Sequence, residues 1–298
     1  MKVLITGANG QLGYCLQHTA PARLTDKSTA LELRAVTRSE FDLARPELLA
    51  GLLDQWNPDV IINAAAYTAV DKAEQDQATA TTVNADAVLA LASWCESRGA
   101  QLVQVSTDFV FAGDSAAPYP INADCAPLSV YGHTKLRGEQ LAMQACPSAY
   151  IVRTGWVYAE HGANFVKTML RLGRERDQLG VVADQVGTPT YAKNLAEMIW
   201  RLLARRPEQR IHHFSDAGVA SWYDFAAAIF EEAEALALLP KQPQLRPITT
   251  ADYPTPAHRP SYSVLDKTTT WKLLEITPQH WRQALRTMLK NLKNLDQL

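Results

Sequence analysis

One segment near the N-terminus gives the first indication of the fold: Lys2-Val3-Leu4-Ile5-Thr6-Gly7-Ala8-Asn9-Gly10-Gln11-Leu12-Gly13. Its first part, Lys2–Thr6, is short and mostly apolar, as is typical of a strand buried on both faces of a sheet. The glycines that follow, Gly7, Gly10 and Gly13, permit a tight turn, close approach of the main chain to phosphate and close helix–strand packing. The segment therefore predicts a strand, a turn and a helix whose N-terminus binds the pyrophosphate of a dinucleotide.

Short apolar runs continue to alternate with longer helical patterns through the first half of the chain. Further strands are expected at Leu31–Val36, Asp59–Asn63, Gln101–Ser106 and Ala149–Thr154, each buried on both faces, and the clearest helices at Ala78–Arg98 and Leu128–Ala145. Repeated strand–helix units predict an α/β fold with a doubly wound parallel sheet of the Rossmann type. Ligands of such sheets bind beyond the carboxyl ends of the strands.

The second half differs in composition. Prolines gather between Pro240 and Pro260 and indicate an irregular segment, which is flanked by helical patterns at Tyr191–Ala204, Ser221–Leu236 and Pro278–Asn291. We expect an NAD(P)-binding Rossmann domain over residues 1–155. Residues 156–298 are expected to form mainly a smaller substrate-binding lobe, with some segments returning to the Rossmann sheet.

Composition excludes several classes of protein. With 298 residues, 47% hydrophobic, 20% charged and a net charge of -2, the chain is ordinary for a globular protein and has no field that attracts nucleic acid or an anionic membrane. The basic run Arg282–Lys293 carries apolar residues at helical spacing and indicates an amphipathic helix. Its four cysteines are scattered, which argues against zinc and disulfides and predicts a cytoplasmic location. The first apolar run is too short for a signal or a membrane span.

The end of the second predicted strand bears on the choice between NAD and NADP. An acidic residue there would bind the ribose 2′-hydroxyl, but the sequence continues with Thr37, Arg38 and Ser39 before Glu40. Arg38 could bind a 2′-phosphate through its planar donors, or it could be a solvated surface arginine. NADPH is the predicted cofactor, and NADH remains possible.

Tyr131 and Lys135 lie in the run Ser129–Lys135 and are four residues apart, so they share one face of a helix. A free tyrosine titrates near pH ~10. A nearby ammonium stabilises the phenolate, and we expect Lys135 to lower the pKa of Tyr131 for general acid catalysis. Lys135 could also hydrogen-bond the nicotinamide ribose. The pair predicts hydride transfer from a nicotinamide, with Tyr131 as proton donor.

Ser106, Thr107 and Asp108 follow at the end of the fourth predicted strand. The hydroxyl of Thr107 is expected to donate to the substrate carbonyl. Ser106 is the rival for this role, because neighbouring residues of a strand point to opposite faces. Asp108 is expected to accept from sugar hydroxyls, with a loop cap as the alternative.

These motifs, together with the runs Asn63–Asp71 and Ser106–Phe111, resemble the extended short-chain dehydrogenases/reductases. Three later runs, Arg153–Tyr158, Gly187–Thr190 and Tyr253–Pro260, resemble the dTDP-4-dehydrorhamnose reductase branch of that superfamily, over nearly the whole chain. The resemblance implies an oxidoreductase that reduces the 4-keto group of dTDP-6-deoxy-L-lyxo-4-hexulose to dTDP-L-rhamnose.

The resemblance also implies roles for individual residues. It makes Thr107, Tyr131 and Lys135 the catalytic trio, and it gives as cofactor contacts Gly10, Gln11, Leu12, Asp42, Leu43, Ala66, Tyr67 and Thr68. The sugar pocket would be lined by Val70, Asp108 and Trp156. An indole suits the apolar face of a deoxysugar, although Trp156 could also be core packing. Arg259 is the candidate for the diphosphate, with a plain surface role as the alternative.

Two positions depart from the family pattern. Some members hold magnesium at a dimer interface with acidic side chains, and the matching position on the first helix is Cys15, a poor ligand for a hard cation. A magnesium site is therefore doubtful, no metal is predicted, and a homodimer remains possible beside a monomer. Phe109 stands where a tyrosine is common.

Two other functions remain open. A redox-neutral nucleotide-sugar epimerase or dehydratase would share the fold, but dehydratases generally carry an acid where this chain has Phe109. A cofactor-binding regulatory subunit is the second alternative, because the beta subunit of methionine adenosyltransferase resembles the same family. The presence of Thr107, Tyr131 and Lys135 favours an enzyme.

Overall fold

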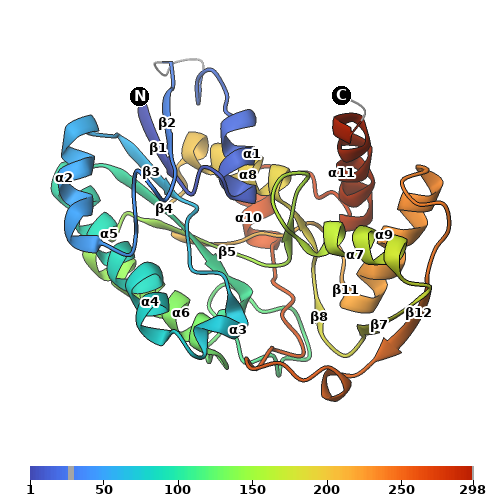
Figure 1. The fold of residues 1–298 in the computed structure, drawn as a ribbon. Helices are drawn as coiled ribbons and strands as arrows, with labels where there is room; N and C mark the ends of the chain where they lie inside the picture. Colours follow the sequence, from blue (N-terminus) through green and yellow to red (C-terminus); the bar gives the residue numbers. More distant parts are fainter. Residues whose placement is uncertain (26–29, 297–298) are drawn as a thin grey trace.

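The computed structural model describes residues 1–25 and 30–296, and within them six strands form one parallel sheet in the order β10-β5-β4-β3-β1-β2 (Figure 1). The strands of the sheet are β1 (Lys2–Thr6), β2 (Glu32–Val36), β3 (Val60–Asn63), β4 (Gln101–Thr107), β5 (Tyr150–Thr154) and β10 (Ile211–His213). The chain order reverses between β1 and β3, and at such a switch point the diverging loops leave a crevice for a ligand. The predicted doubly wound sheet is confirmed.

Helices cover both faces of this sheet. One face packs against α1 (Gln11–His18) and α8 (Ala192–Arg205), and the other against α2 (Pro46–Trp56), α5 (Ala87–Arg98) and α6 (Val130–Ala145). The expected strand and helix bounds in this half agree with the structure to within one or two residues, with one exception described below. One expectation is wrong: β2 is not buried on both faces, because it lies at the edge of the sheet, where Glu32 and Arg34 are exposed.

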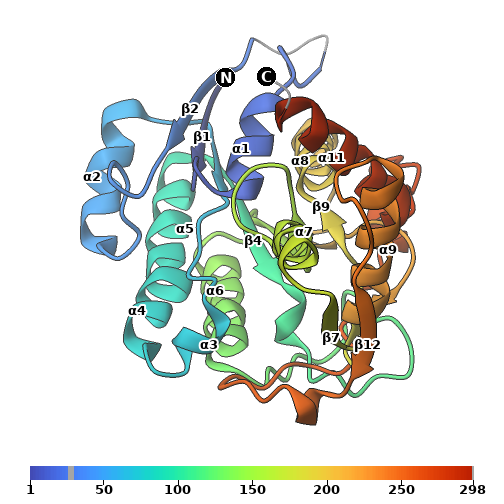
Figure 2. The same ribbon diagram turned by 45° about the vertical axis from the view of Figure 1, so that its right-hand side comes forward.

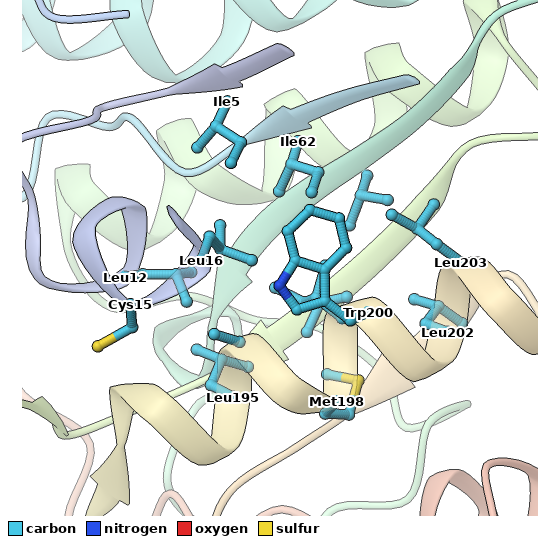
Figure 3. Close-up of a cluster of buried hydrophobic side chains, with 14 of the residues drawn as sticks. Ile5, Leu12, Cys15, Leu16, Ile62, Leu195, Met198, Trp200, Leu202 and Leu203 are labelled. Carbon is cyan, nitrogen blue, oxygen red and sulfur yellow. The ribbon is translucent and has the colours of Figure 1, made fainter. Parts of the chain in front are cut away.

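The core between the sheet and α8 contains Trp200, whose indole lies among apolar side chains such as Ile62 and Leu16 (Figure 3). Its Nε1 is buried and has no hydrogen-bond partner among the described residues. A buried donor without a partner costs about 1–3 kcal/mol. Trp200 therefore fills volume in this core at the expense of one unpaired polar atom.

The helix expected at Ala78–Arg98 is interrupted. It consists of α4 (Gln77–Thr81), a π-helical turn at Thr82–Asp86, and α5. A π turn inserts an extra residue into the helix and turns neighbouring side chains in new directions, often at functional sites. Here the π turn directs Asn84 toward the active-site side of the molecule, as the contacts of Asn84 described below show.

The second half builds a lobe beside the sheet with its own core (Figures 1 and 2). Its main helices are α7 (Phe165–Glu175), α9 (Trp222–Ala235) and α11 (Trp281–Asp296), and its longest strands, β7 (Gln178–Val182) and β12 (Gln244–Ile248), pair in parallel. The predicted amphipathic helix is confirmed, since α11 buries Leu285, Met288 and Leu289. The proline-rich segment is more regular than expected, because it contains β12.

Shorter elements complete the chain: α3 (Val70–Ala73), β6 (Val157–Tyr158), β8 (Val186–Gly187), β9 (Thr190–Tyr191), β11 (Ala220–Ser221), α10 (Thr268–Leu273), and 3₁₀ turns at Asp108–Val110 and Thr250–Asp252. Residues 211–213 form β10, which pairs with β5, so a segment of the second half lies in the main sheet. Over residues 1–25 and 30–296, no helix has the length and apolar character needed to cross a membrane.

Candidate active site

A buried polar ladder fixes the carboxyl ends of three neighbouring strands. Thr6 Oγ1 at the end of β1 donates to Asn63 Oδ1 at 2.5 Å, and Asn63 Nδ2 at the end of β3 donates to Gln104 Oε1 of β4 at 2.7 Å. Ala65 N, in the loop after β3, donates to Thr6 Oγ1. The edge of the sheet where a ligand is expected is therefore held in a fixed register.

The glycine turn forms a cradle at the start of α1. Gly7 adopts φ +70°, a backbone conformation that favours glycine, and Gly10 N donates to Gly7 O at 2.8 Å. A Cβ on Gly13 would lie 2.1 Å from Gly7 O, so the helix can approach the turn only with glycine there. Gly10 precedes α1 and has no side chain to cap its first N–H groups. Such N–H groups and the positive end of the helix dipole suit a phosphate.

Three other predicted cofactor residues are Gln11, Leu12 and Leu43. Gln11 Oε1 accepts from Asn164 Nδ2 at 3.0 Å, which ties the first turn of α1 to α7 of the second lobe. Leu12 and Leu43 have buried side chains on opposite faces of the sheet. Their main chains are therefore the parts available to a cofactor.

The turn after β2 presents Arg38. Its side chain is 79% exposed, and its Nε lies 3.4 Å from Asp42 Oδ1. Glu40 instead closes the turn, since its carboxylate accepts from Thr37 N and Oγ1 at 2.9 Å each, and these bonds lower the pKa of Glu40. Glu40, the first acidic residue after β2, is thus hydrogen-bonded within its own turn, while the guanidinium of Arg38 is accessible to an anion.

The predicted contacts Ala66, Tyr67 and Thr68 follow β3, and the π turn holds Tyr67 among them. Asn84, which is buried, accepts from Tyr67 N at 2.9 Å and donates to Tyr67 O at 3.1 Å. It also donates to Thr134 Oγ1 of α6 at 3.1 Å. The sequence analysis missed Asn84. A poor helix former within a helical pattern was the available signal.

Helix α6, which carries Tyr131 and Lys135, approaches its neighbours very closely. A Cβ on Gly132 would lie 2.4 Å from Phe109 O, and one on Gly138 would lie 2.1 Å from Asn84 O. Ser129 caps the helix by accepting from Gly132 N. The position of the two side chains is therefore set by backbone packing against the 3₁₀ turn and the π turn.

Tyr131 is partly buried, and its hydroxyl meets Thr107. Burial raises the pKa of Tyr131 to about 12, the hydrogen bond with Thr107 lowers it, and the charge of Asp108 raises it. The expected acidification by Lys135 is not found, because Lys135 Nζ donates to Val105 O at 2.6 Å instead. Burial lowers the pKa of Lys135 to about 8, against the effect of Glu139. Tyr131 therefore holds its proton at neutral pH.

Thr107 links Tyr131 to a buried carboxylate. Its hydroxyl donates to Asp108 Oδ1 at 3.1 Å and accepts from Phe109 N at 3.2 Å. Thr107 also lowers the pKa of Tyr131, which is the effect of a hydroxyl that donates toward the phenolate. Ser106 donates to Glu139 and is turned away from Tyr131. The structure thus brings together Tyr131 and Thr107. The Thr107 hydroxyl can make its expected donation to a carbonyl only if it gives up its hydrogen bond to Asp108.

Asp108 does not face open space. Its side chain is buried, with 2% of the residue exposed, and burial raises its pKa to about 6, against hydrogen bonds from Ser263 and Thr107. In this structure the carboxylate accepts the hydrogen bond of Thr107, the residue beside Tyr131. Its expected contact with sugar hydroxyls remains a prediction.

A buried ion pair lies behind the catalytic candidates. Arg153 Nη2 of β5 lies 2.7 Å from Glu139 Oε2 of α6, and the two side chains are only 5% and 4% exposed. Arg153 Nε also donates to Glu139, and Ser106 donates to the same carboxylate. The sequence analysis missed this pair, although Glu139 stands one helical turn beyond Lys135.

The remaining substrate candidates are differently engaged. Val70 begins α3 and is partly buried, and Trp156 stacks on Trp222 with ring centroids 3.5 Å apart. Arg259 forms a bidentate pair with Asp71, with N–O distances of 3.0 and 2.7 Å. Its guanidinium is therefore occupied by a carboxylate, and a contact with a diphosphate would have to replace that pair.

Cys15 lies on α1 and is not suited to bind a hard metal ion. Its side chain is buried, and burial, with the charge of Glu160, raises the pKa of its thiol to about 12. A neutral thiol is a poor ligand for magnesium. Across the described ranges 1–25 and 30–296, no group of three or more His, Cys, Asp or Glu side chains is arranged to hold a metal ion.

Comparisons with known proteins identify the family of the chain. The sequence matches the family described as RmlD substrate binding domain over residues 1–294. The dTDP-4-dehydrorhamnose reductase of Aggregatibacter actinomycetemcomitans is 42% identical over 292 residues, which are 96% of this chain and 98% of that protein.

Solved structures give the same relationship. The dTDP-4-dehydrorhamnose reductase of Bacillus anthracis in complex with NADP has a TM-score of 0.88 and 34% identity, covering 97% of this chain and 99% of its own. The UDP-glucose 4-epimerase of Thermus thermophilus in complex with NAD has a TM-score of 0.78 at 18% identity, covering 98% and 99% of the two chains, which is a likeness of fold alone. The chain belongs to the RmlD substrate-binding-domain family, that of the dTDP-4-dehydrorhamnose reductases.

Proposed function

We propose that this protein is an NADPH-dependent oxidoreductase of dTDP-rhamnose biosynthesis. It reduces the 4-keto group of dTDP-6-deoxy-L-lyxo-4-hexulose to give dTDP-L-rhamnose. The observation that carries the proposal is the grouping of Tyr131, Thr107 and Asp108 on the ligand side of a Rossmann sheet, in which Thr107 is bonded to Asp108 and lowers the pKa of Tyr131. Its support is membership of a family whose relatives are named dTDP-4-dehydrorhamnose reductase.

The glycine cradle fits a dinucleotide, because Gly7, Gly10 and Gly13 leave main-chain N–H groups of α1 without a capping side chain. The exposed Arg38 suits a 2′-phosphate, which supports NADPH over NADH, and the related Bacillus anthracis reductase was crystallised with NADP. When bound, NADPH supplies a hydride to the ketone carbon. Asp42 and residues 66–68 complete the proposed cofactor site.

Tyr131 supplies the proton in this mechanism. A ketone oxygen that gains negative charge needs a proton donor, and Tyr131, with its pKa raised by burial to about 12, is protonated at neutral pH. Its proton moves from Oη to the sugar O4. Thr107 lies beside the phenol and lowers its pKa, and Lys135, whose Nζ donates to Val105 O at 2.6 Å, carries a positive charge below its pKa of about 8 and binds the nicotinamide ribose in this proposal.

The second lobe supplies the substrate side of the site. We infer that residues 1–155 bind the cofactor and residues 156–298 contribute mainly substrate contacts, with β10 returning to the sheet. In this arrangement Val70 and Trp156 line the sugar pocket. Arg259 would bind the diphosphate by exchanging its partner Asp71.

The alternatives have less support. Phe109 occupies the place where sugar dehydratases carry an acid, and the likeness to the Thermus thermophilus epimerase concerns the fold alone. A regulatory subunit would not need the grouping of Tyr131, Thr107 and Asp108.

The test is product analysis of the keto-sugar incubated with NADPH and, separately, with NADH. We expect one NADPH oxidised per dTDP-L-rhamnose formed, and Tyr131→Phe to lower kcat by about 10²–10⁴-fold. Tyr253→Phe is the matched control, because Tyr253 is 62% exposed. An isomerised product without net oxidation of NADPH would indicate an epimerase. Binding of NADPH without turnover would indicate a regulatory subunit.

A further inference from the structure

The backbone of Trp156 has an unusual conformation. Its φ is +51°, which is rare for a bulky side chain and which persists only where surrounding contacts impose it. Thr190 supplies two of these contacts, since its Oγ1 donates to Gly155 O at 2.6 Å and its N donates to Trp156 O at 3.1 Å. Strained residues of this kind gather at ligand sites.

The side chain of Trp156 is held by a second indole. Trp222 stacks on the indole of Trp156, with the ring centroids 3.5 Å apart and the ring planes 3° from parallel. The ring centroid of Phe165 in α7 lies 4.7 Å from that of Trp222. Aromatic pairs left to themselves prefer offset or edge-to-face arrangements over such a parallel overlap. The surrounding backbone therefore sets this stack.

That backbone is the pairing of β11 with β8. Ala220 pairs with Gly187 and Ser221 with Val186, so Trp222, the next residue, is fixed relative to Gly187. Gly187 lies directly against the same indole, because a Cβ there would be 2.6 Å from Cε2 of Trp156. Trp156 is thus located by two contacts from later segments of its own lobe, an aromatic ring and a glycine.

We propose that Trp222 is a positioning residue that fixes the indole of Trp156 and thereby sets the affinity of the site for the deoxysugar. The inference rests on the proposed function, in which Trp156 lines the sugar pocket. Trp156 follows β5, whose last residue Thr154 pairs with Thr107, so this indole is carried at the same edge of the sheet as the catalytic candidates. Trp222 acts through Trp156 in this arrangement.

The test compares the steady-state kinetics of two variants, each of which changes one of the two contacts with the indole of Trp156. Trp222→Leu removes the stack, and Gly187→Ala places a methyl group where the indole of Trp156 lies. Each is expected to raise KM for the keto-sugar about 2- to 10-fold, the size of an aromatic pair. Values of kcat and of KM for NADPH should stay within about twofold. Trp222→Phe should recover much of the affinity.

Controls separate this role from a general loss of structure. Trp271→Phe and Gly51→Ala change the same residue types away from the site, and a Cβ on Gly51 meets nothing within 4 Å. Wild-type KM for the sugar in both Trp222→Leu and Gly187→Ala would overturn the inference. So would equal losses in kcat and both KM values.

The proposed function is judged separately, by turnover of the wild type. Should the wild type fail to turn over, calorimetric titration with dTDP-L-rhamnose still decides the inference. Weaker binding by Trp222→Leu than by the wild type would support it, and equal binding would overturn it.

Discussion

The buried pair of Glu139 and Arg153 allows a quantitative prediction. In Glu139→Ala, the guanidinium of Arg153 loses its carboxylate partner while its side chain remains 5% exposed. Removal of one partner from a buried ion pair costs about 3–5 kcal/mol, because the other charge stays buried without compensation. Ser106 also loses its acceptor. At roughly 2–4 °C per kcal/mol for a chain of this size, Tm should fall by about 6–20 °C.

The assay is thermal unfolding followed by circular dichroism, with the double variant Glu139→Leu/Arg153→Met as the matched control. Replacing both charges by apolar side chains of similar volume is often neutral or stabilising, so the double variant should regain most of the lost stability. A fall of less than 2 °C for Glu139→Ala would refute the reasoning. A double variant no more stable than Glu139→Ala would do the same.

The same carboxylate also affects the pH dependence of activity. Burial lowers the pKa of Lys135 to about 8, and the negative charge of Glu139 opposes this effect. In Glu139→Gln the opposing charge is lost, so the pKa of Lys135 falls further. The alkaline limb of the kcat/KM profile should therefore move to lower pH than in the wild type. An unchanged limb would mean that Lys135 is not the group that titrates there.

Three further predictions concern single positions. Trp200→Phe removes a buried N–H that has no partner among the described residues, so the free energy of unfolding in urea should stay unchanged or rise by about 1 kcal/mol; a loss above 2 kcal/mol would contradict this. Gly13→Ala places a Cβ 2.1 Å from Gly7 O and should weaken NADPH binding, measured by cofactor fluorescence, by at least about tenfold; wild-type affinity would argue against the cradle. Burial raises the pKa of Asp108 from 3.8 to about 6, so this group contributes stability that is present below pH 3.8 and lost as the pH rises through 6, roughly 3 kcal/mol in all. Asp108→Asn should remove that part of the pH dependence, and parallel stability curves for the two proteins would show the inference to be wrong.

Local features of the sequence predicted much of the fold. The strands at Lys2–Thr6 and Tyr150–Thr154 and the glycine turn depend on neighbouring residues, so pattern and residue type are sufficient. The exposure of β2 could not be predicted in the same way. It depends on the order of the strands in the sheet, which one strand's own sequence does not encode.

The site was predicted where its residues lie close in sequence and missed where partners are distant. Tyr131 and Lys135 follow from helical spacing, but Lys135 bonds to Val105, and this preference depends on how the helix packs. The stack of Trp156 on Trp222 joins residues that are far apart in the sequence. No spacing rule connects such residues, because only the folded chain brings them together.

The pairing of β10 with β5 has a consequence for expressing the two halves of the protein as separate fragments. In the intact protein His212 stands opposite Val152, so the last strand of the nucleotide-binding half is covered by a segment that is translated some sixty residues later. A fragment ending at residue 155 would present β5 as a bare row of peptide N–H and C=O groups, which recruit other chains. Such a truncated product is expected to precipitate when expressed alone and to be rescued by co-expressing the complementary half.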